Sequence, residues 1–201
     1  IIGAAGKMGK GIAVLLLQEM AKVKNAKLHL IDSNSDAFSD LREYLEGQLL
    51  KYAEKNINQL RIQFKERLDL VSNKEIIDYF VFQALKLIHF SNSITAASSS
   101  FLVFEAIVEE FEEKVALFSS LKKQQKQKSF FFTNTSSIPI HLLNDLSSLD
   151  GHIIGFHFYN PPVMQKVIEL VVLNNRSKDL KTIAEELAKR LNKIIVSSSD
   201  V

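Results

Sequence analysis

A glycine-rich segment between two apolar stretches constrains this chain more than any other part of its sequence. Ile1 and Ile2 are typical of the end of a buried strand, residues 3–11 have the sequence GAAGKMGKG, and an apolar stretch runs from Ile12 to Met20. Glycines between a strand and a helix let the backbone approach a pyrophosphate, to which the helix N-terminus offers free N–H groups. The segment therefore predicts a nucleotide site, with a plain glycine turn as the alternative.

The spacing of the glycines departs from the usual G-x-G-x-x-G pattern. The chain has either Gly3, Gly6 and Gly9 in this role, or Ala4 at the first glycine position. Both interpretations alter the first tight turn, where the usual pattern has a glycine. The residues expected to lie against a cofactor run from the strand end into the helix: Gly3, Ala4, Ala5, Gly6, Lys7, Met8 and Gly9.

An acidic residue ends the second predicted strand. Residues 27–32, KLHLID, alternate in polarity and end in Asp32. A carboxylate about 20 residues past the glycines can accept both ribose hydroxyls of an adenosine and would repel a 2′-phosphate, which favours NAD over NADP. Asp32 is also suited to cap a helix, because residues 32–35 are rich in capping side chains.

Apolar strands and amphipathic helices alternate along the rest of the chain. Further strands are expected at residues 87–90, 101–106, 130–133, 153–158, 167–172 and 194–196, and helices at 36–55, 59–67, 74–86, from about 109 to 128, after Pro139, and at 179–191. This alternation predicts an α/β fold of the Rossmann type, doubly wound around a mostly parallel sheet. The helices at 36–55 and 59–67 are expected to form a hairpin inserted at the sheet edge.

Composition excludes several classes of function. With 46% hydrophobic and 24% charged residues, the 201-residue chain suits a folded protein, and its net charge of +2 gives no argument for nucleic acid. It has no cysteine, which excludes thiol nucleophiles and cysteine-bound metals. No apolar run reaches about 18 residues, so no membrane span is expected. We expect a cytoplasmic protein, with an organelle such as the mitochondrial matrix as the alternative.

A histidine and a glutamate flank a proline-rich turn. His157 lies near the end of a predicted strand, Asn160-Pro161-Pro162 follows, and Glu169 lies inside the next predicted strand. A neutral imidazole is the natural base near pH 7. An unpaired carboxylate inside a strand is costly, so Glu169 is expected to have a partner. The pair predicts a base oriented by a carboxylate, with a packed histidine at a strand end as the alternative.

Polar residues also follow the strand at residues 130–133. The sequence there is Asn134-Thr135-Ser136-Ser137, with Pro139 at the expected start of a helix. Open α/β sheets place their sites beyond the carboxyl ends of their strands. The alternative is a simple capping turn.

Four segments together resemble the NAD-binding domain of the L-3-hydroxyacyl-CoA dehydrogenases: GAAGKMGKGIA, FEAIVEEFEEKVALF, TNTSSIPI and GFHFYNPPVMQKVIE. The resemblance covers nearly the whole chain and is strongest after Phe101. It implies hydride transfer between NAD and the 3-hydroxyl of an L-3-hydroxyacyl-CoA, in fatty-acid β-oxidation or 3-hydroxybutyryl-CoA metabolism. It also implies that residues 1–201 are an NAD-binding domain cut at both ends, lacking a helical C-terminal domain through which the full protein forms a homodimer. The isolated chain is then expected to be inactive.

The resemblance assigns roles by position and implies no metal. Its catalytic residues fall on His157, Glu169 and Ser136, the last of which meets the substrate oxygen. Besides the glycine segment, its cofactor contacts fall on Asp32, Glu109, Lys114, Asn134, Ser136 and Asn160. Its acyl-CoA contacts fall on Ser136 and on Lys55, while Gln48 replaces the serine that the family has one turn before that lysine.

Two other functions stay open. One is a different NAD-dependent hydroxyacid dehydrogenase. The lack of an arginine near His157 to hold a substrate carboxylate argues against it. The other is a non-catalytic NAD-binding fragment. Both fit the glycine segment. Activity with acetoacetyl-CoA but not with oxaloacetate would favour the 3-hydroxyacyl-CoA dehydrogenase over another hydroxyacid dehydrogenase, and turnover of either substrate would exclude a non-catalytic fragment.

Overall fold

The first residues of the chain join two groups of strands into one sheet. The computed structural model describes residues 1–23, 25–173 and 178–200. Strand β1 (Leu28–Ile31) pairs in parallel with β2 (Ile88–Ser91). Ile2 forms parallel bridges to Ile31 on one side and to Glu105 on the other. The Ile1–Ile2 segment is therefore a short central strand, as its apolar sequence predicts.

The other strands continue the sheet outward from this centre. Their order is β3 (Leu102–Glu105), β4 (Phe130–Thr133), β5 (Ile153–Phe158), β6 (Val167–Val171) and β7 (Ile194–Ser198). Strands β3, β4 and β5 are parallel, β6 is antiparallel to β5, and β7 is parallel to β6. The predicted α/β sheet, mostly parallel, is confirmed, and the reversal at β6 places Glu169 directly opposite His157.

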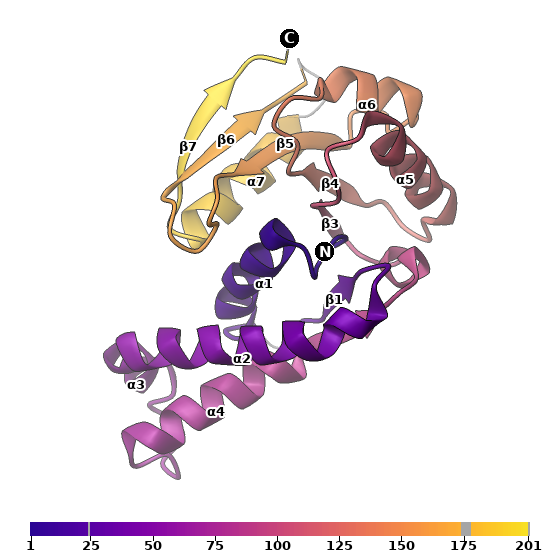
Figure 1. Cartoon of the computed structure of the whole chain (residues 1–201). Coiled ribbons are helices and arrows are strands. Elements are labelled where there is room, and N and C mark those ends of the chain that lie inside the picture. Colours follow the sequence, from indigo (N-terminus) through magenta and orange to yellow (C-terminus); the bar gives the residue numbers. More distant parts are fainter. Residues whose placement is uncertain (24, 174–177, 201) are drawn as a thin grey trace.

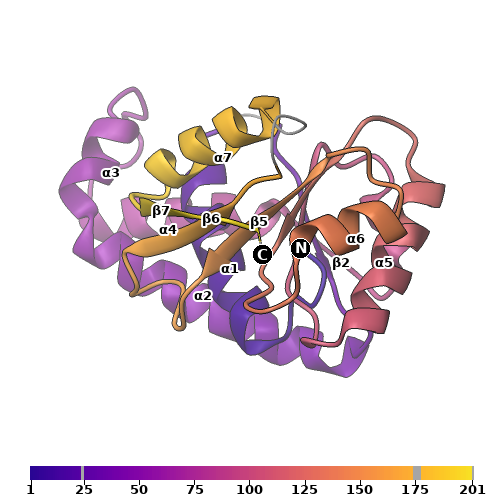
Figure 2. The same ribbon diagram turned by 90° about the horizontal axis from the view of Figure 1, so that it is seen from above.

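Helices cover both faces of the sheet (Figures 1 and 2). They are α1 (Lys7–Met20), α2 (Phe38–Lys55), α3 (Ile57–Gln63), α4 (Asn73–Lys86), α5 (Phe111–Gln124), α6 (Ile140–Leu146) and α7 (Lys178–Arg190), with 3₁₀ turns at Ser35–Ala37 and Ile94–Ala97. One buried cluster joins α1, α2, α4 and α7 to the sheet, and a second joins α5 and α6 to its other face. Alternate residues of β5 follow this division, since Phe156 and Phe158 belong to the first cluster and Ile153 to the second.

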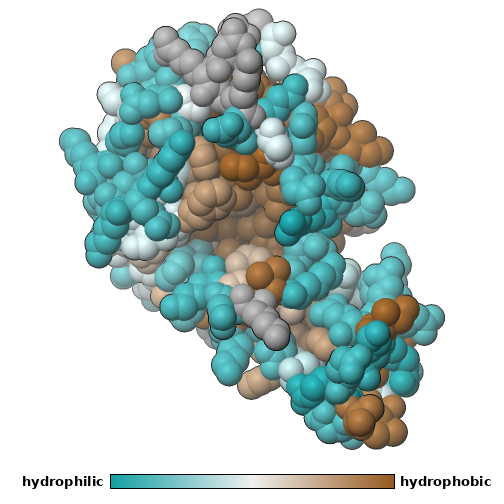
Figure 3. Space-filling model, turned by 180° about the vertical axis from the view of Figure 1, so that it is seen from behind, coloured by the Kyte–Doolittle hydropathy of each residue, from teal (hydrophilic) through white to brown (hydrophobic). Residues whose placement is uncertain are grey.

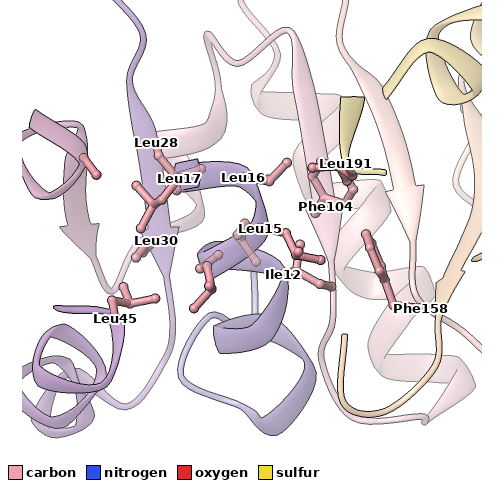
Figure 4. Close-up of a cluster of buried hydrophobic side chains, with 14 of the residues drawn as sticks. Ile12, Leu15, Leu16, Leu17, Leu28, Leu30, Leu45, Phe104, Phe158 and Leu191 are labelled. Carbon is pink, nitrogen blue, oxygen red and sulfur yellow. The ribbon is translucent and has the colours of Figure 1, made fainter. Parts of the chain in front are cut away.

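Helix α1 lies at the centre of the larger cluster (Figure 4). Every residue from Ile12 to Leu17 is buried, so the helix is apolar on all sides. In the close-up, Leu28, Leu30 and Leu45 lie on one side of α1, and Phe104 and Phe158 lie on the other. Burial of each such side chain contributes about 1.5–3 kcal/mol. This packing fixes the helix that follows the glycine segment.

The helical hairpin at the sheet edge differs from the predicted one. Helix α2 packs along α4, and the short α3 lies at the far end of this pair (Figure 1). The pairing of residues 36–55 with residues 59–67 is therefore wrong, although a hairpin is present. Helix α4 begins with a capping box, in which Ser72 and Glu75 bond each other's backbone N–H. Helix α5 ends at Gln124, earlier than the expected end at about residue 128.

Candidate active site

The glycine segment makes a turn with no room for a side chain at Gly3 or Gly9. Gly3 has φ +77°, and a Cβ there would lie 2.5 Å from the carbonyl oxygen of Ala106. A Cβ on Gly9 would lie 2.0 Å from the carbonyl oxygen of Gly3. The tight turn is thus at Gly3, which favours the spacing Gly3, Gly6, Gly9 over the interpretation that starts at Ala4.

A cleft of about 730 Å³ opens beside this turn, between the ends of β1 and β3. Strand order reverses there around the Ile1–Ile2 segment, which is where doubly wound sheets bind nucleotides. Of the residues predicted to hold a cofactor, those that line the cleft are Gly3, Gly6, Lys7, Met8 and Asp32. Ala4, Ala5 and Gly9 shape the turn behind it. Asn92 and Ile94, from a connector to which the sequence assigned no chemistry, also line it.

Asp32 is attached to the glycine segment. Its Oδ2 accepts a hydrogen bond from Ala5 N at 2.9 Å, and its Oδ1 accepts one from Asn34 N at 3.1 Å. The cap of the following 3₁₀ turn is Asn34, whose side chain accepts from Asp36 N, so the capping alternative for Asp32 is wrong. The Asp32 carboxylate lines the cleft while linking β1 to the turn.

His157 and Glu169 face each other across β5 and β6. His157 Nδ1 lies 3.1 Å from Glu169 Oε2, and the two side chains are 16% and 27% exposed. Ser198 on β7 donates its hydroxyl to Glu169 Oε1 at 2.6 Å, a contact that the sequence analysis missed. The hydrogen bond from Ser198 first, and that from His157 second, lower the pKa of Glu169. The carboxylate is therefore ionised at neutral pH and has both oxygens engaged.

Asn134 and the turn after β5 support the position of His157. Asn134 Oδ1 accepts a hydrogen bond from Phe158 N at 2.8 Å, which links the loop after β4 to the end of β5. Asn160 is exposed in the following turn and precedes a cis proline bond. Pro162 packs so closely on α1 that a Cβ on Gly11 would lie 2.8 Å from its ring. The end of β5 is thereby held against α1, the helix that follows the glycine segment.

Glu109 holds the loop that contains Ser136. Its Oε1 accepts hydrogen bonds from Thr135 Oγ1 at 2.5 Å, Ser136 N at 2.8 Å, Ser136 Oγ at 3.3 Å and Ser137 N at 3.1 Å. Lys114 Nζ lies 3.3 Å from its Oε2. Burial raises the pKa of Glu109, but the hydrogen bonds from Thr135 and Ser136 and the charge of Lys114 outweigh burial and lower it to about 2. Glu109 does not line the cofactor cleft but orients this loop.

A buried ion pair lies behind this loop. Lys114 Nζ is 2.6 Å from Glu105 Oε1, and the two side chains are 1% and 0% exposed. Glu105 also accepts hydrogen bonds from Ile107 N at 2.8 Å and from the Thr133 hydroxyl. The buried Lys114 ammonium group thus lies between the carboxylates of Glu105 and Glu109. Sequence reasoning missed Glu105, because nothing in the strand FLVFEA identifies its partner.

Lys55 lies apart from the cofactor cleft, in a groove of about 610 Å³ between the helical hairpin and the turn after β5. Lys51 and Lys55, one turn apart on α2, are both exposed there, and Gln48 lines the same groove. Met164 and Lys166 come from the segment between β5 and β6. The groove therefore joins a basic helix face to the turn that follows His157.

Over the described ranges of the chain, no group of three or more His, Cys, Asp and Glu side chains could hold a metal ion. Within the same ranges, no helix is long and apolar enough to cross a membrane. The reverse face has an apolar hollow surrounded by hydrophilic surface (Figure 3).

The fold and the position of the cleft define a dinucleotide-binding domain. The chain belongs to the family "3-hydroxyacyl-CoA dehydrogenase, NAD binding domain", whose model matches residues 1–201. It is 32% identical over 203 aligned residues to the mitochondrial hydroxyacyl-coenzyme A dehydrogenase of Sus scrofa, covering 100% of this chain and 58% of that protein. The chain thus spans little more than half the length of this relative.

Solved structures show the same fold. The crystal structure of 3-hydroxybutyryl-CoA dehydrogenase from Escherichia coli has a TM-score of 0.76 and 23% identity, over 100% of this chain and 38% of that one. That of FadB2 from M. tuberculosis has a TM-score of 0.74 and 25% identity, over 98% of this chain and 62% of that one. The Rossmann-type prediction and the family resemblance are confirmed.

Proposed function

We propose that the protein containing this chain transfers hydride between NAD and the 3-hydroxyl group of an L-3-hydroxyacyl-CoA. The observation that carries the proposal is the His157–Glu169 pair, with Nδ1 and Oε2 separated by 3.1 Å, on the sheet that also forms the nucleotide cleft. Family membership supports NAD as the cofactor and a hydroxyacyl-CoA as the substrate.

The residues present fit a dinucleotide. Gly3 and Gly9 allow the tight turn, and Gly3, Gly6 and Lys7 line the cleft at the start of α1, where a helix N-terminus offers N–H groups to a pyrophosphate. Asp32 lies at the end of β1, where a carboxylate accepts ribose hydroxyls. When bound, NAD⁺ supplies the acceptor for the hydride that leaves the substrate carbon.

His157 is the proposed base. Its Nδ1 faces Glu169, which leaves Nε2 as the nitrogen that takes the hydroxyl proton of the substrate. Glu169 accepts a hydrogen bond from Nδ1–H, fixes this tautomer and stabilises the imidazolium that forms. General-base catalysis of this kind contributes about 10²–10⁴ in rate. In the reverse direction, the imidazolium returns its proton to the carbonyl oxygen.

Ser136 is proposed to hydrogen-bond the reacting oxygen. Its hydroxyl and its backbone N–H are both within reach of Glu109, so the loop is oriented before substrate binds. A hydroxyl both donates and accepts, and it can therefore follow the oxygen as it changes from alcohol to carbonyl. Asn134 and Asn160 flank the end of β5 and are proposed to contact the nicotinamide half of the cofactor.

The coenzyme A portion is proposed to lie along the groove that contains Lys55. Lys51 on the preceding turn adds a second exposed ammonium group, which suits the phosphates of coenzyme A. Because Met164 lines the same groove, a thioester extended along it leads toward the turn after His157. The helical C-terminal domain, the homodimer and the cytoplasmic location stay predictions; the Sus scrofa relative is mitochondrial.

The test is His157→Gln in the protein that contains the chain. We expect kcat for acetoacetyl-CoA reduction to fall about 10²–10⁴-fold with unchanged NADH affinity, because the base does not hold the cofactor. His89→Gln, on an exposed residue of β2, is the matched control and should change neither. Equal losses of turnover and NADH binding in His157→Gln would contradict the catalytic role. Reduction of oxaloacetate in place of acetoacetyl-CoA would favour a different hydroxyacid dehydrogenase.

A further inference from the structure

Three neighbouring strands bring three polar side chains together on one face of the sheet. In the antiparallel β5–β6 pair, His157 lies opposite Glu169. In the parallel β6–β7 pair, Glu169 lies beside Val196 and Val171 lies beside Ser198. Residues two apart on a strand share a face, so Ser198 is the diagonal neighbour of Glu169. His157, Glu169 and Ser198 form a row across the three strands, which we call the β5–β7 row.

Each contact in the β5–β7 row uses a different oxygen of Glu169. Oε2 lies 3.1 Å from His157 Nδ1, and Oε1 accepts the Ser198 hydroxyl at 2.6 Å. The serine is bonded to the carboxylate and not to the imidazole, which is the arrangement opposite to that of a serine nucleophile activated by histidine. Ser198 therefore acts on the reaction only through Glu169.

We propose that Ser198 is a positioning residue that holds the Glu169 carboxylate in the orientation from which it directs His157. The inference rests on the proposed function, because it assigns Ser198 a role through the proposed base. Rotation about the last side-chain bond of a glutamate is soft, so one hydrogen bond to histidine leaves the carboxylate free to turn. With 27% of its side chain exposed, Glu169 would otherwise share its second oxygen with water. A donor on Oε1 fixes the plane of the carboxylate and aims Oε2 at Nδ1.

The electrostatics of the row support this role. A hydroxyl bonded to a carboxylate is a charge-assisted hydrogen bond and favours the ionised form. The bond from Ser198 is the largest cause of the lowered pKa of Glu169. The hydrogen bond from His157, on the adjacent strand, is the second cause and acts in the same direction. Ser198 thus keeps a negative charge beside the imidazole, where it stabilises the imidazolium formed during oxidation.

The experiment compares Ser198→Ala with Ser198→Thr in the protein that contains the chain. Alanine removes the hydroxyl, and we expect kcat for oxidation of an L-3-hydroxyacyl-CoA to fall about tenfold, with KM for NAD⁺ unchanged. The acid limb of the pH–rate profile should move to lower pH, because a carboxylate that is less well held stabilises the imidazolium less. Threonine keeps the hydroxyl and should restore most of the turnover and the original profile.

Ser197→Ala is the matched control, because Ser197 pairs with Leu170 and so points to the opposite face. The inference is overturned if Ser198→Ala keeps the parent kcat and pH profile, whatever its melting temperature, or if Ser198→Thr is as slow as Ser198→Ala. His157→Gln separates the two proposals. A slow His157→Gln with a normal Ser198→Ala removes only the role of Ser198, whereas an active His157→Gln removes the proposed base itself.

Discussion

Replacing Gly9 by alanine should break the turn on which the cofactor site is built. The new Cβ would lie 2.0 Å from the carbonyl oxygen of Gly3 and 2.8 Å from Cα of Ala4. Carbon and oxygen do not normally approach closer than about 3.3 Å, so the turn and α1 must separate by more than ~1 Å. Both contacts involve backbone atoms, and no change of rotamer relieves them.

The expected cost follows from this overlap. Overpacking costs about 1–3 kcal/mol, or more where backbone must move, and alanine recovers only about 1 kcal/mol through its helix propensity. We expect a net loss of about 2 kcal/mol in the free energy of unfolding, which lowers the melting temperature by roughly 4–8 °C for a domain of this size. NADH affinity should fall as well, because the displaced backbone at Gly3 lines the cleft proposed to hold the pyrophosphate.

Thermal and urea unfolding, with an NADH titration followed by fluorescence, measure both effects. Gly47→Ala is the matched control, since a Cβ there meets nothing within 4 Å in the middle of α2. This control should stabilise the chain by about 0.5–1 kcal/mol and leave NADH binding unchanged. A Gly9→Ala variant that melts at or above the parent would refute the argument from the Cβ contact.

Three further predictions concern buried or capping charges. Lys114→Met leaves the Glu105 carboxylate buried without its partner and should cost about 3–5 kcal/mol in urea unfolding, whereas Lys122→Met breaks a surface pair and should cost less than about 1 kcal/mol. Glu109 has a folded pKa of about 2 against an ordinary value of 4.5, so its contribution to stability is complete above about pH 4.5 and is lost as the pH falls toward 2. The melting temperature of Glu109→Gln should therefore fall less between pH 6 and pH 3 than that of the parent. Equal falls would contradict the stabilising role of the ionised Glu109. The Asp200 carboxylate accepts hydrogen bonds from the first two N–H groups of α6 at 2.7 Å. Asp200→Ala should therefore lower the free energy of unfolding by about 1 kcal/mol in thermal unfolding, and Asp200→Asn should lower it by less.

Much of the fold could be predicted because its signals are local. The strands are short apolar blocks such as FFFT at residues 130–133, bounded by polar turns, and α1 follows glycines with an uninterrupted apolar run. The partner of α2 in the helical hairpin could not be predicted from local signals. The capping box of Ser72 and Glu75 marks the start of α4, but which helix packs on α2 depends on contacts distant in sequence.

Some residues of the candidate site could be predicted from local sequence, and others could not. His157, Glu169 and the loop containing Ser136 stand beside turns that the sequence displays, and their residue types suggest chemistry. Ser198 is one of three consecutive serines, and only the register of β7 on β6 identifies the one that reaches Glu169. Glu105 is similar, because Lys114 and Thr133 meet it only after α5 and β4 have packed around β3.

The contact of Gly11 with Pro162 makes α1 a direct connection between the cofactor cleft and the turn after β5. Lys7 and Met8 in the first turn of α1 line the cleft, and Gly11 in the next turn packs against Pro162, which follows β5. Helix α1 therefore sets the spacing between the cleft and the end of β5, where the proposed base His157 lies. A single methyl group at position 11 would lie 2.8 Å from the Pro162 ring and would push the turn after β5 away from α1, which would change this spacing.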